Sequence, residues 1–257
     1  AQASADPPRS SLAAALLALV HPGDEVIVPE PLFDVYGAGI ALASGVAVGV
    51  PLARTTTGFA LDLAAIEAAI TPRTRMILLN TPHNPTGTVF TLAELTALAE
   101  VVARHDLLVL SDEVYEHIVF TPHQHVPFAT LPGMRARTVT VGSGGKTFSF
   151  TGWKVGWGSG PADLIAAVRV VRQHLSYVSS GPFQPAIAVG LALPDSYFAD
   201  LAARMQANRD LLTAGLNDLG LQVIPAGGSY FLTTDVSGLG WSDGVAFVEH
   251  ISRTAGV

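Results

Sequence analysis

The chain has 257 residues, of which 49% are hydrophobic and 14% charged, and its formal net charge is -7. It contains no cysteine, which excludes disulfides, thiolate nucleophiles and cysteine-ligated metals. The acidic balance, without a run of basic residues, argues against a nucleic-acid partner, and the longest apolar stretch, residues 12–20, is too short to span a bilayer.

The length and the apolar composition also bear on assembly and location. A chain of this length can bury a substantial core, and its low share of charged residues leaves apolar surface for an oligomer interface. We therefore expect a homodimer. The first residues lack the basic segment and apolar core of a secretory signal, so the expected location is the cytoplasm, with no membrane partner.

Up to Gly160, short β-branched runs alternate with Ala- and Leu-rich stretches. The predicted strands are residues 25–28, 47–50, 76–79, 107–111 and 138–142. The predicted helices between them are residues 34–43, 61–70 and 92–104. Thr91 and Glu94 fit a capping box at the start of the last of these helices. This alternation predicts an α/β fold with three layers, in which a mostly parallel sheet is covered on both faces.

The pattern changes after Gly160. Long helices are predicted first, at residues 161–177, 182–193 and 197–219. Strands at 222–225 and 230–235 and a helix at 242–253 follow. We expect a large domain at residues 1–220 and the beginning of a small α+β C-terminal domain at residues 221–257.

Polar residues follow three of the predicted strands. Asn80 and Asn84 follow one strand, Asp112 and Tyr115 a second, and Ser143 and Lys146 a third. In open α/β sheets the ligand site lies in the crevice at the carboxyl ends of the strands, so these residues are expected to converge at one edge.

The convergent residue types suit pyridoxal phosphate, which needs an amine for its aldehyde, an acid at its ring nitrogen, donors for its phenolic oxygen, a cationic phosphate cradle and a stacked aromatic ring. The sequence supplies a candidate for each: Lys146, Asp112, Asn84 with Tyr115, Ser143 with Lys154, and Phe33. Taken singly, five of them have ordinary structural explanations: a turn cap for Asp112, a core aromatic for Tyr115 or Phe33, an Asn-Pro turn for Asn84 and a solvated surface lysine for Lys154.

Other ligand motifs fail. A Walker loop ending at Gly145-Lys146-Thr147 would need glycine where Thr140 stands, and a dinucleotide fingerprint would need glycine at Thr147. The histidines of residues 123–125, with His117 nearby, lie in a polar loop without a clustered carboxylate, so no metal is predicted.

In combination these motifs resemble the class I/II aminotransferases of pyridoxal phosphate fold type I. The motifs are residues 80–87, the segment Ser111-Asp112-Glu113-Val114-Tyr115 and residues 143–154. Residues 112–117, 151–157 and 182–185 are most similar to the branch of kynurenine, methionine and N-succinyl-diaminopimelate aminotransferases.

The resemblance implies a role for each candidate. Lys146 would be the catalytic Schiff-base lysine, Asp112 would face the ring nitrogen, and Asn84 would contact the phenolic oxygen and the substrate. Tyr115 would join Asn84, Ser143 and Lys154 would bind phosphate, and Phe33 would stack on the ring.

The implied activity moves an amine from an amino acid to a 2-oxo acid such as 2-oxoglutarate, and the amino acid could be N-succinyl-diaminopimelate. A cysteine-conjugate β-lyase and a degenerate, non-catalytic cofactor-binding homologue are the alternatives, and nothing in the sequence separates the lyase from the transaminase.

Two departures from the family pattern accompany the resemblance. The phosphate loop before the first helix is replaced by Pro7-Pro8-Arg9-Ser10-Ser11, in which the prolines cannot donate and Ser10 or Ser11 could partly substitute. The arginine that binds the substrate carboxylate would come after Val257. The sequence is therefore expected to be truncated at both ends.

Overall fold

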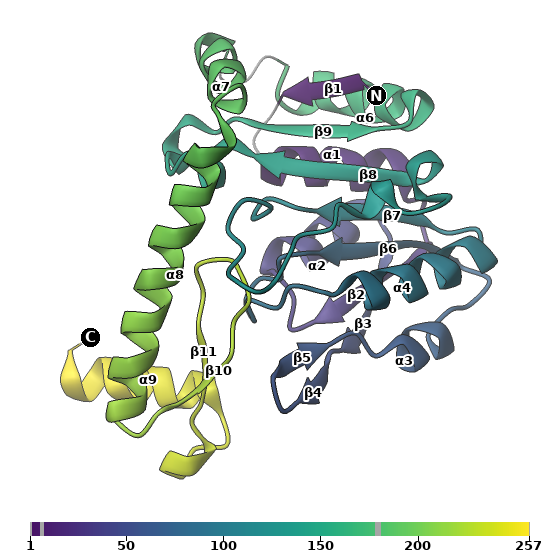
Figure 1. Cartoon of the computed structure of the whole chain (residues 1–257). Helices are drawn as coiled ribbons and strands as arrows, with labels where there is room; N and C mark the ends of the chain where they lie inside the picture. Colours follow the sequence, from purple (N-terminus) through teal and green to yellow (C-terminus); the bar gives the residue numbers. More distant parts are fainter. Residues whose placement is uncertain (1, 6–7, 178–180, 257) are drawn as a thin grey trace.

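A seven-stranded sheet organises the part of the chain that the computed structural model describes, residues 2–5, 8–177 and 181–256 (Figure 1). Its order is β1-β9-β8-β7-β6-β2-β3. The five strands from β8 to β3 in this order are parallel, whereas β9 is antiparallel to β8, and β1 is antiparallel to β9. The strands are β1 Gln2–Ala5, β2 Glu25–Glu30, β3 Val46–Pro51, β6 Thr74–Asn80, β7 Leu108–Asp112, β8 Thr138–Ser143 and β9 Gly156–Gly160.

Helices cover both faces of this sheet. One core cluster joins the sheet to α1 Pro8–Leu19, α2 Asp34–Leu42 and α6 Ala162–Leu175. A second cluster joins the opposite face to α3 Leu63–Ala68 and α4 Leu92–Arg104. A short hairpin, β4 Ala53–Thr55 and β5 Gly58–Ala60, lies between β3 and α3 along the chain. The predicted three-layer α/β fold with a mostly parallel sheet is thus confirmed.

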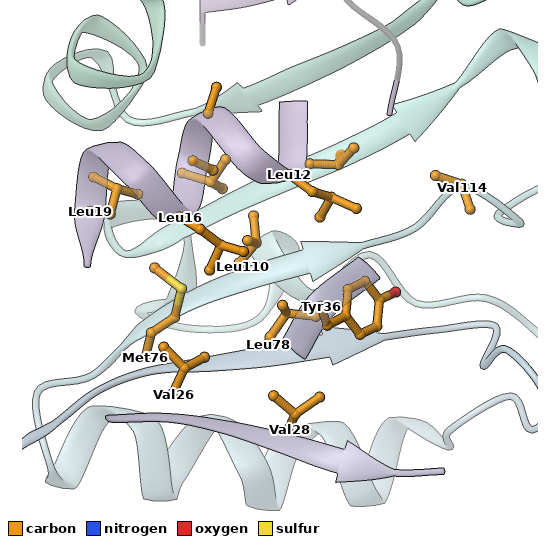
Figure 2. Close-up of a cluster of buried hydrophobic side chains, with 14 of the residues drawn as sticks. Leu12, Leu16, Leu19, Val26, Val28, Tyr36, Met76, Leu78, Leu110 and Val114 are labelled. Atoms are coloured by element: carbon orange, nitrogen blue, oxygen red, sulfur yellow. The ribbon is translucent and has the colours of Figure 1, made fainter. Parts of the chain in front are cut away.

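Alternation along the central strands explains why their middle residues are apolar on both faces. In β6, Met76 and Leu78 belong to the first cluster, while Ile77 and Leu79 belong to the second, and all four are fully buried. Figure 2 shows the first cluster, with side chains of α1 lying over those of the central strands. A strand with helices on both faces has no solvent side, so it needs no polar positions.

The start of α4 agrees with the sequence prediction in detail. Thr91 accepts a hydrogen bond from the Glu94 backbone N–H through its hydroxyl at 3.2 Å, and its own backbone N–H donates to the Glu94 carboxylate at 2.8 Å. This reciprocal capping satisfies two N–H groups that the first helical turn leaves without partners. The helix occupies the predicted residues.

The C-terminal part runs away from the sheet. Figure 1 shows α8 leading from the region of α7 down to the hairpin of β10 and β11 and to α9. The bounds are α7 Gln184–Leu191, α8 Asp195–Asp218, β10 Gln222–Ile224, β11 Thr233–Asp235 and α9 Gly244–Ala255. The strand predicted at residues 230–235 is wrong in its first half, because only Thr233–Asp235 pairs with β10. The domain boundary at residue 220 stays a prediction.

No single helix in the described ranges is long and apolar enough to cross a membrane. By length and composition, the bent pair of segments Gly181–Leu191 and Asp195–Asp218, which meet at 94°, could do so together.

Candidate functional site

The carboxyl ends of β6, β7 and β8 border a cavity of about 790 Å³. These strands are neighbours in the sheet, so the residues that follow them meet at one edge, as expected for a parallel α/β sheet. All seven predicted site residues line this cavity: Phe33, Asn84, Asp112, Tyr115, Ser143, Lys146 and Lys154. The structure therefore brings the predicted set together, while the role of each residue stays a prediction.

Asp112 is the last residue of β7 and is 3% exposed. Burial raises its pKa from 3.8 to about 6, although hydrogen bonds from the Tyr36 hydroxyl at 2.7 Å and from the Val114 backbone N–H at 3.4 Å favour the charged form. The same burial, together with the neighbouring Asp112 carboxylate, raises the pKa of Tyr36 well above its usual range. From the sequence, Tyr36 is only an aromatic residue at helical spacing from Phe33. The sequence analysis therefore did not predict that it donates a hydrogen bond to Asp112.

The loop after β6 is attached to the end of β7 by the Asn80 side chain. Its amide nitrogen donates to the Asp112 carbonyl at 2.9 Å, and its amide oxygen accepts from the Asn84 backbone N–H at 2.7 Å. Asn84 is half-buried, and within the described ranges its own side-chain amide has no hydrogen bond to the protein. Asn84 can therefore donate to a ligand in the cavity.

Lys146 lies in the short helix α5, Gly144–Thr147, directly after β8. The two glycines before it stand in tight packing, since a Cβ on Gly144 would lie 2.6 Å from the Ile187 side chain and one on Gly145 would lie 3.0 Å from the backbone of Thr151. The Lys146 amine donates a hydrogen bond to the Tyr230 hydroxyl and lies 5.4 Å from the ring centre of Tyr115 and 5.0 Å from that of Tyr230.

The candidate phosphate side of the cavity carries hydroxyls and a cation. Ser143 is buried at the end of β8, and Thr151 and Lys154 come from the loop before β9. Lys154 has a left-handed backbone with φ of 54°. Ser10, at the start of α1, also lines the cavity. This position agrees with the expectation that Ser10 could partly substitute for the altered phosphate loop. Pro7 lies outside the described residues.

Two aromatic residues of the cavity, Tyr230 and Phe231, were not predicted as site residues. The sequence analysis placed them in a strand, but neither belongs to one. The preceding Gly227-Gly228-Ser229 segment was the available signal, because two glycines allow close backbone approach before an aromatic pair.

A second polar cluster lies outside the cavity lining. Nε2 of His125 is 2.9 Å from the Glu113 carboxylate, and Glu113, Glu116 and His125 offer ligand atoms that lie within 4.8 Å of one another. The expectation that no carboxylate accompanies the histidines of residues 123–125 is therefore wrong. Glu113 also accepts from the Ser111 hydroxyl at 2.7 Å and from the Phe128 backbone N–H at 3.1 Å, so it connects β7 to the following loop.

Residues 9–256 match the family described as aminotransferase class I and II. The chain belongs to this family, whose members depend on pyridoxal phosphate.

Three relatives come from the branch that the sequence resembles. The chain is 47% identical over 247 residues to a probable N-succinyldiaminopimelate aminotransferase, DapC, of Mycobacterium tuberculosis, covering 96% of this chain and 62% of the relative. It is 42% identical to mouse kynurenine–oxoglutarate transaminase 3, with 90% and 54% covered, and 39% identical to Escherichia coli methionine aminotransferase, with 96% and 64% covered.

A solved structure of the Mycobacterium tuberculosis N-succinyldiaminopimelate aminotransferase superposes with a TM-score of 0.97 at 45% identity, covering 100% of this chain and 67% of the solved one. The predicted family resemblance is confirmed. The chain spans roughly three fifths of the length of the curated relatives.

Proposed function

We propose that this chain carries the catalytic centre of a pyridoxal-phosphate-dependent aminotransferase. One observation supports the proposal above the others: the Lys146 amine, the buried Asp112 carboxylate and the Asn84 amide, which has no hydrogen-bond partner among the described residues, line a single cavity at the carboxyl edge of the sheet. The family and the names of the three relatives agree with this activity.

The residues of the cavity fit the parts of pyridoxal phosphate by donor type. Ser143, Thr151 and Lys154 would hold the phosphate, since hydroxyls and an ammonium group suit an oxyanion. Asp112 would face the ring nitrogen, and Phe33 would cover the ring. Asn84 and Tyr115 would bind the phenolic oxygen. Burial and the Tyr230 hydroxyl raise the pKa of Tyr115 far above its usual range, so its hydroxyl keeps the proton, which would turn from the Tyr230 oxygen to the cofactor.

When bound, the cofactor supplies an aldehyde for the amine and a ring that withdraws electrons from the substrate. Asp112 would keep a proton on the ring nitrogen, because a buried carboxylate favours a cation beside it. Lys146, as a free amine at the cavity wall, would take the proton from Cα of the amino acid. Asn84 would also orient the substrate.

We further propose that a 2-oxo acid such as 2-oxoglutarate accepts the amine, and that N-succinyl-diaminopimelate is a candidate donor. The name of the Mycobacterium tuberculosis relative supports this choice. Large apolar side chains exposed at the end of α6 and on α7, namely Leu175, Val189 and Leu191, support a homodimer. The cytoplasm as the location and residues 1–220 as the large domain complete the proposal.

Lys146 and Lys154 are the only lysines of the sequence, which makes the attachment point testable. The full-length protein is loaded with cofactor, reduced with borohydride, and digested for mass spectrometry. We expect the cofactor mass on the peptide that contains Lys146, in the wild type and in Lys154→Met, and no such peptide in Lys146→Ala. We also expect Lys146→Ala to lose the visible absorption of the loaded protein and its conversion when amino acids are added singly. Label on Lys154, or wild-type turnover in Lys146→Ala, would show that the proposal is wrong.

A further inference from the structure

The Tyr230 hydroxyl joins two residues of the cavity. It accepts a hydrogen bond from the Lys146 amine and a longer one, 3.5 Å, from the Tyr115 hydroxyl. The rings of Tyr115 and Tyr230 meet edge to face, with centres 5.2 Å apart. Tyr230 thus contacts the reactive amine from a segment that follows β10, far along the chain from β8 and α5.

Backbone contacts fix the segment that carries Tyr230. The N–H groups of Gly227 and Gly228 both donate to the Gly87 carbonyl at 2.9 Å, and the Ser229 N–H donates to the Ile118 carbonyl at 2.8 Å. The segment is therefore attached both to the loop that carries Asn84 and to the chain after Tyr115.

The packing leaves little room for another arrangement. A Cβ on Gly228 would lie 2.7 Å from the Ile118 carbonyl oxygen, and one on Gly87 would lie 2.6 Å from Ala226. Ser229 is fully buried and has a left-handed backbone with φ of 63°, a conformation that costs energy for a non-glycine residue. Such an arrangement directs the next side chain, Tyr230, into the cavity.

We infer that Tyr230 is a positioning residue for Lys146: its hydroxyl holds Nζ toward the cavity whenever the amine is free. The inference rests on the proposed function for its catalytic meaning, but the contact itself exists without cofactor. A free lysine side chain has several rotatable bonds, and one hydrogen bond at its end selects an orientation that the chain alone does not.

The contact is tested by competitive labelling of the two lysines in cofactor-free, full-length protein. Trinitrobenzenesulfonate is added in small amounts, and the ratio of label on Lys146 to label on Lys154 is measured by peptide mass spectrometry. Lys154 lies on the same cavity and serves as the internal reference. We expect Tyr230→Phe to raise the ratio about fivefold, the factor of one ordinary net hydrogen bond. Tyr230→Leu should raise it at least as much, and Tyr197→Phe, on α8 outside the cavity, should leave it unchanged.

A ratio in both Tyr230 variants equal to that of the wild type overturns the inference. The labelling needs no turnover, so this result is independent of the borohydride experiment, which tests the proposed function. In the loaded enzyme, a positioning role further predicts that Tyr230→Phe lowers kcat about tenfold and leaves KM nearly unchanged. A change in KM alone would instead make Tyr230 a substrate contact and count against the inference.

Discussion

Asp112→Asn should make the cofactor-free protein more stable at neutral pH. Burial raises the pKa of this carboxyl from 3.8 to about 6, so at pH 8 the native state holds a carboxylate that the unfolded chain accommodates more easily. The difference of about 2 pKa units corresponds to about 3 kcal/mol, at about 1.4 kcal/mol per unit. An asparagine of the same shape removes this cost and can still bond to Tyr36 or Val114 with its amide.

The pH dependence separates this effect from other consequences of the substitution. Below pH 3.8 the carboxyl is protonated in both states, so its burial costs no ionisation energy there; the cost grows as the pH rises from 3.8 to about 6 and is constant above that. The stability of Asp112→Asn relative to the wild type should therefore increase by about 2–3 kcal/mol between pH 4 and pH 8.

Urea unfolding of the cofactor-free, full-length protein at several pH values measures this difference, with Asp200→Asn at an exposed position of α8 as the matched control. The control should show no such increase. A difference between Asp112→Asn and wild type that stays constant from pH 4 to pH 8 would refute the reasoning, because the carboxylate would then cost nothing in the native state. The same variant should lose transamination, since its amide cannot stabilise a proton on the ring nitrogen.

Three further predictions concern Tyr36, His83 and Gly228. Tyr36→Phe removes a hydrogen-bond donor that favours the charged form of Asp112, so the pKa of Asp112 should rise above about 6. In the Tyr36→Phe background, the effect of Asp112→Asn on the urea midpoint should therefore develop at higher pH, and an unshifted profile would contradict the contact. Burial lowers the pKa of His83 from 6.5 to about 4, so the unfolded chain binds a proton before the native protein does as the pH falls. The free energy of unfolding should therefore drop by about 3 kcal/mol between pH 6.5 and pH 4. His83→Gln should lack this loss in the same titration, and equal slopes for both proteins would exclude it. Gly228→Ala places a Cβ 2.7 Å from a backbone carbonyl and should cost about 1–3 kcal/mol of unfolding free energy, whereas Gly215→Ala, in open space on α8, should be neutral or slightly stabilising; equal urea midpoints for the two would contradict the packing.

The parts of the fold that local chemistry specifies were predictable. Helix α4 begins where its capping box stands, and the parallel strands follow their apolar runs. Strand β9 was missed, because its sequence Gly-Trp-Gly-Ser-Gly has no β-branched residue. Its place in the sheet depends instead on close approach to β8: a Cβ on Gly142 would collide with the Trp157 indole, so this pairing requires glycine.

The site was predictable as a set of residue types but not as a set of contacts. Asp112 and Lys146 are recognisable from their place at the ends of strands. Nothing near them in sequence shows that Asp112 accepts a hydrogen bond from Tyr36, or that Lys146 donates one to Tyr230. His125 shows the same limit, because its carboxylate partner Glu113 lies 12 residues away in the sequence, beyond the range of a local pattern. Contacts between separate elements depend on the tertiary fold, which local propensity does not encode.

Several features in and beside the cavity cost stability. The buried carboxylate of Asp112 and the left-handed backbone of Lys154 border the cavity, and Ser229, also left-handed, directly precedes Tyr230, which lines it; each of these features is unfavourable taken alone. At Ser229, the long-range backbone bond to the Ile118 carbonyl helps to hold the unfavourable conformation. Substitutions that relieve these costs should therefore stabilise the cofactor-free protein while weakening its chemistry, and Asp112→Asn is the clearest case.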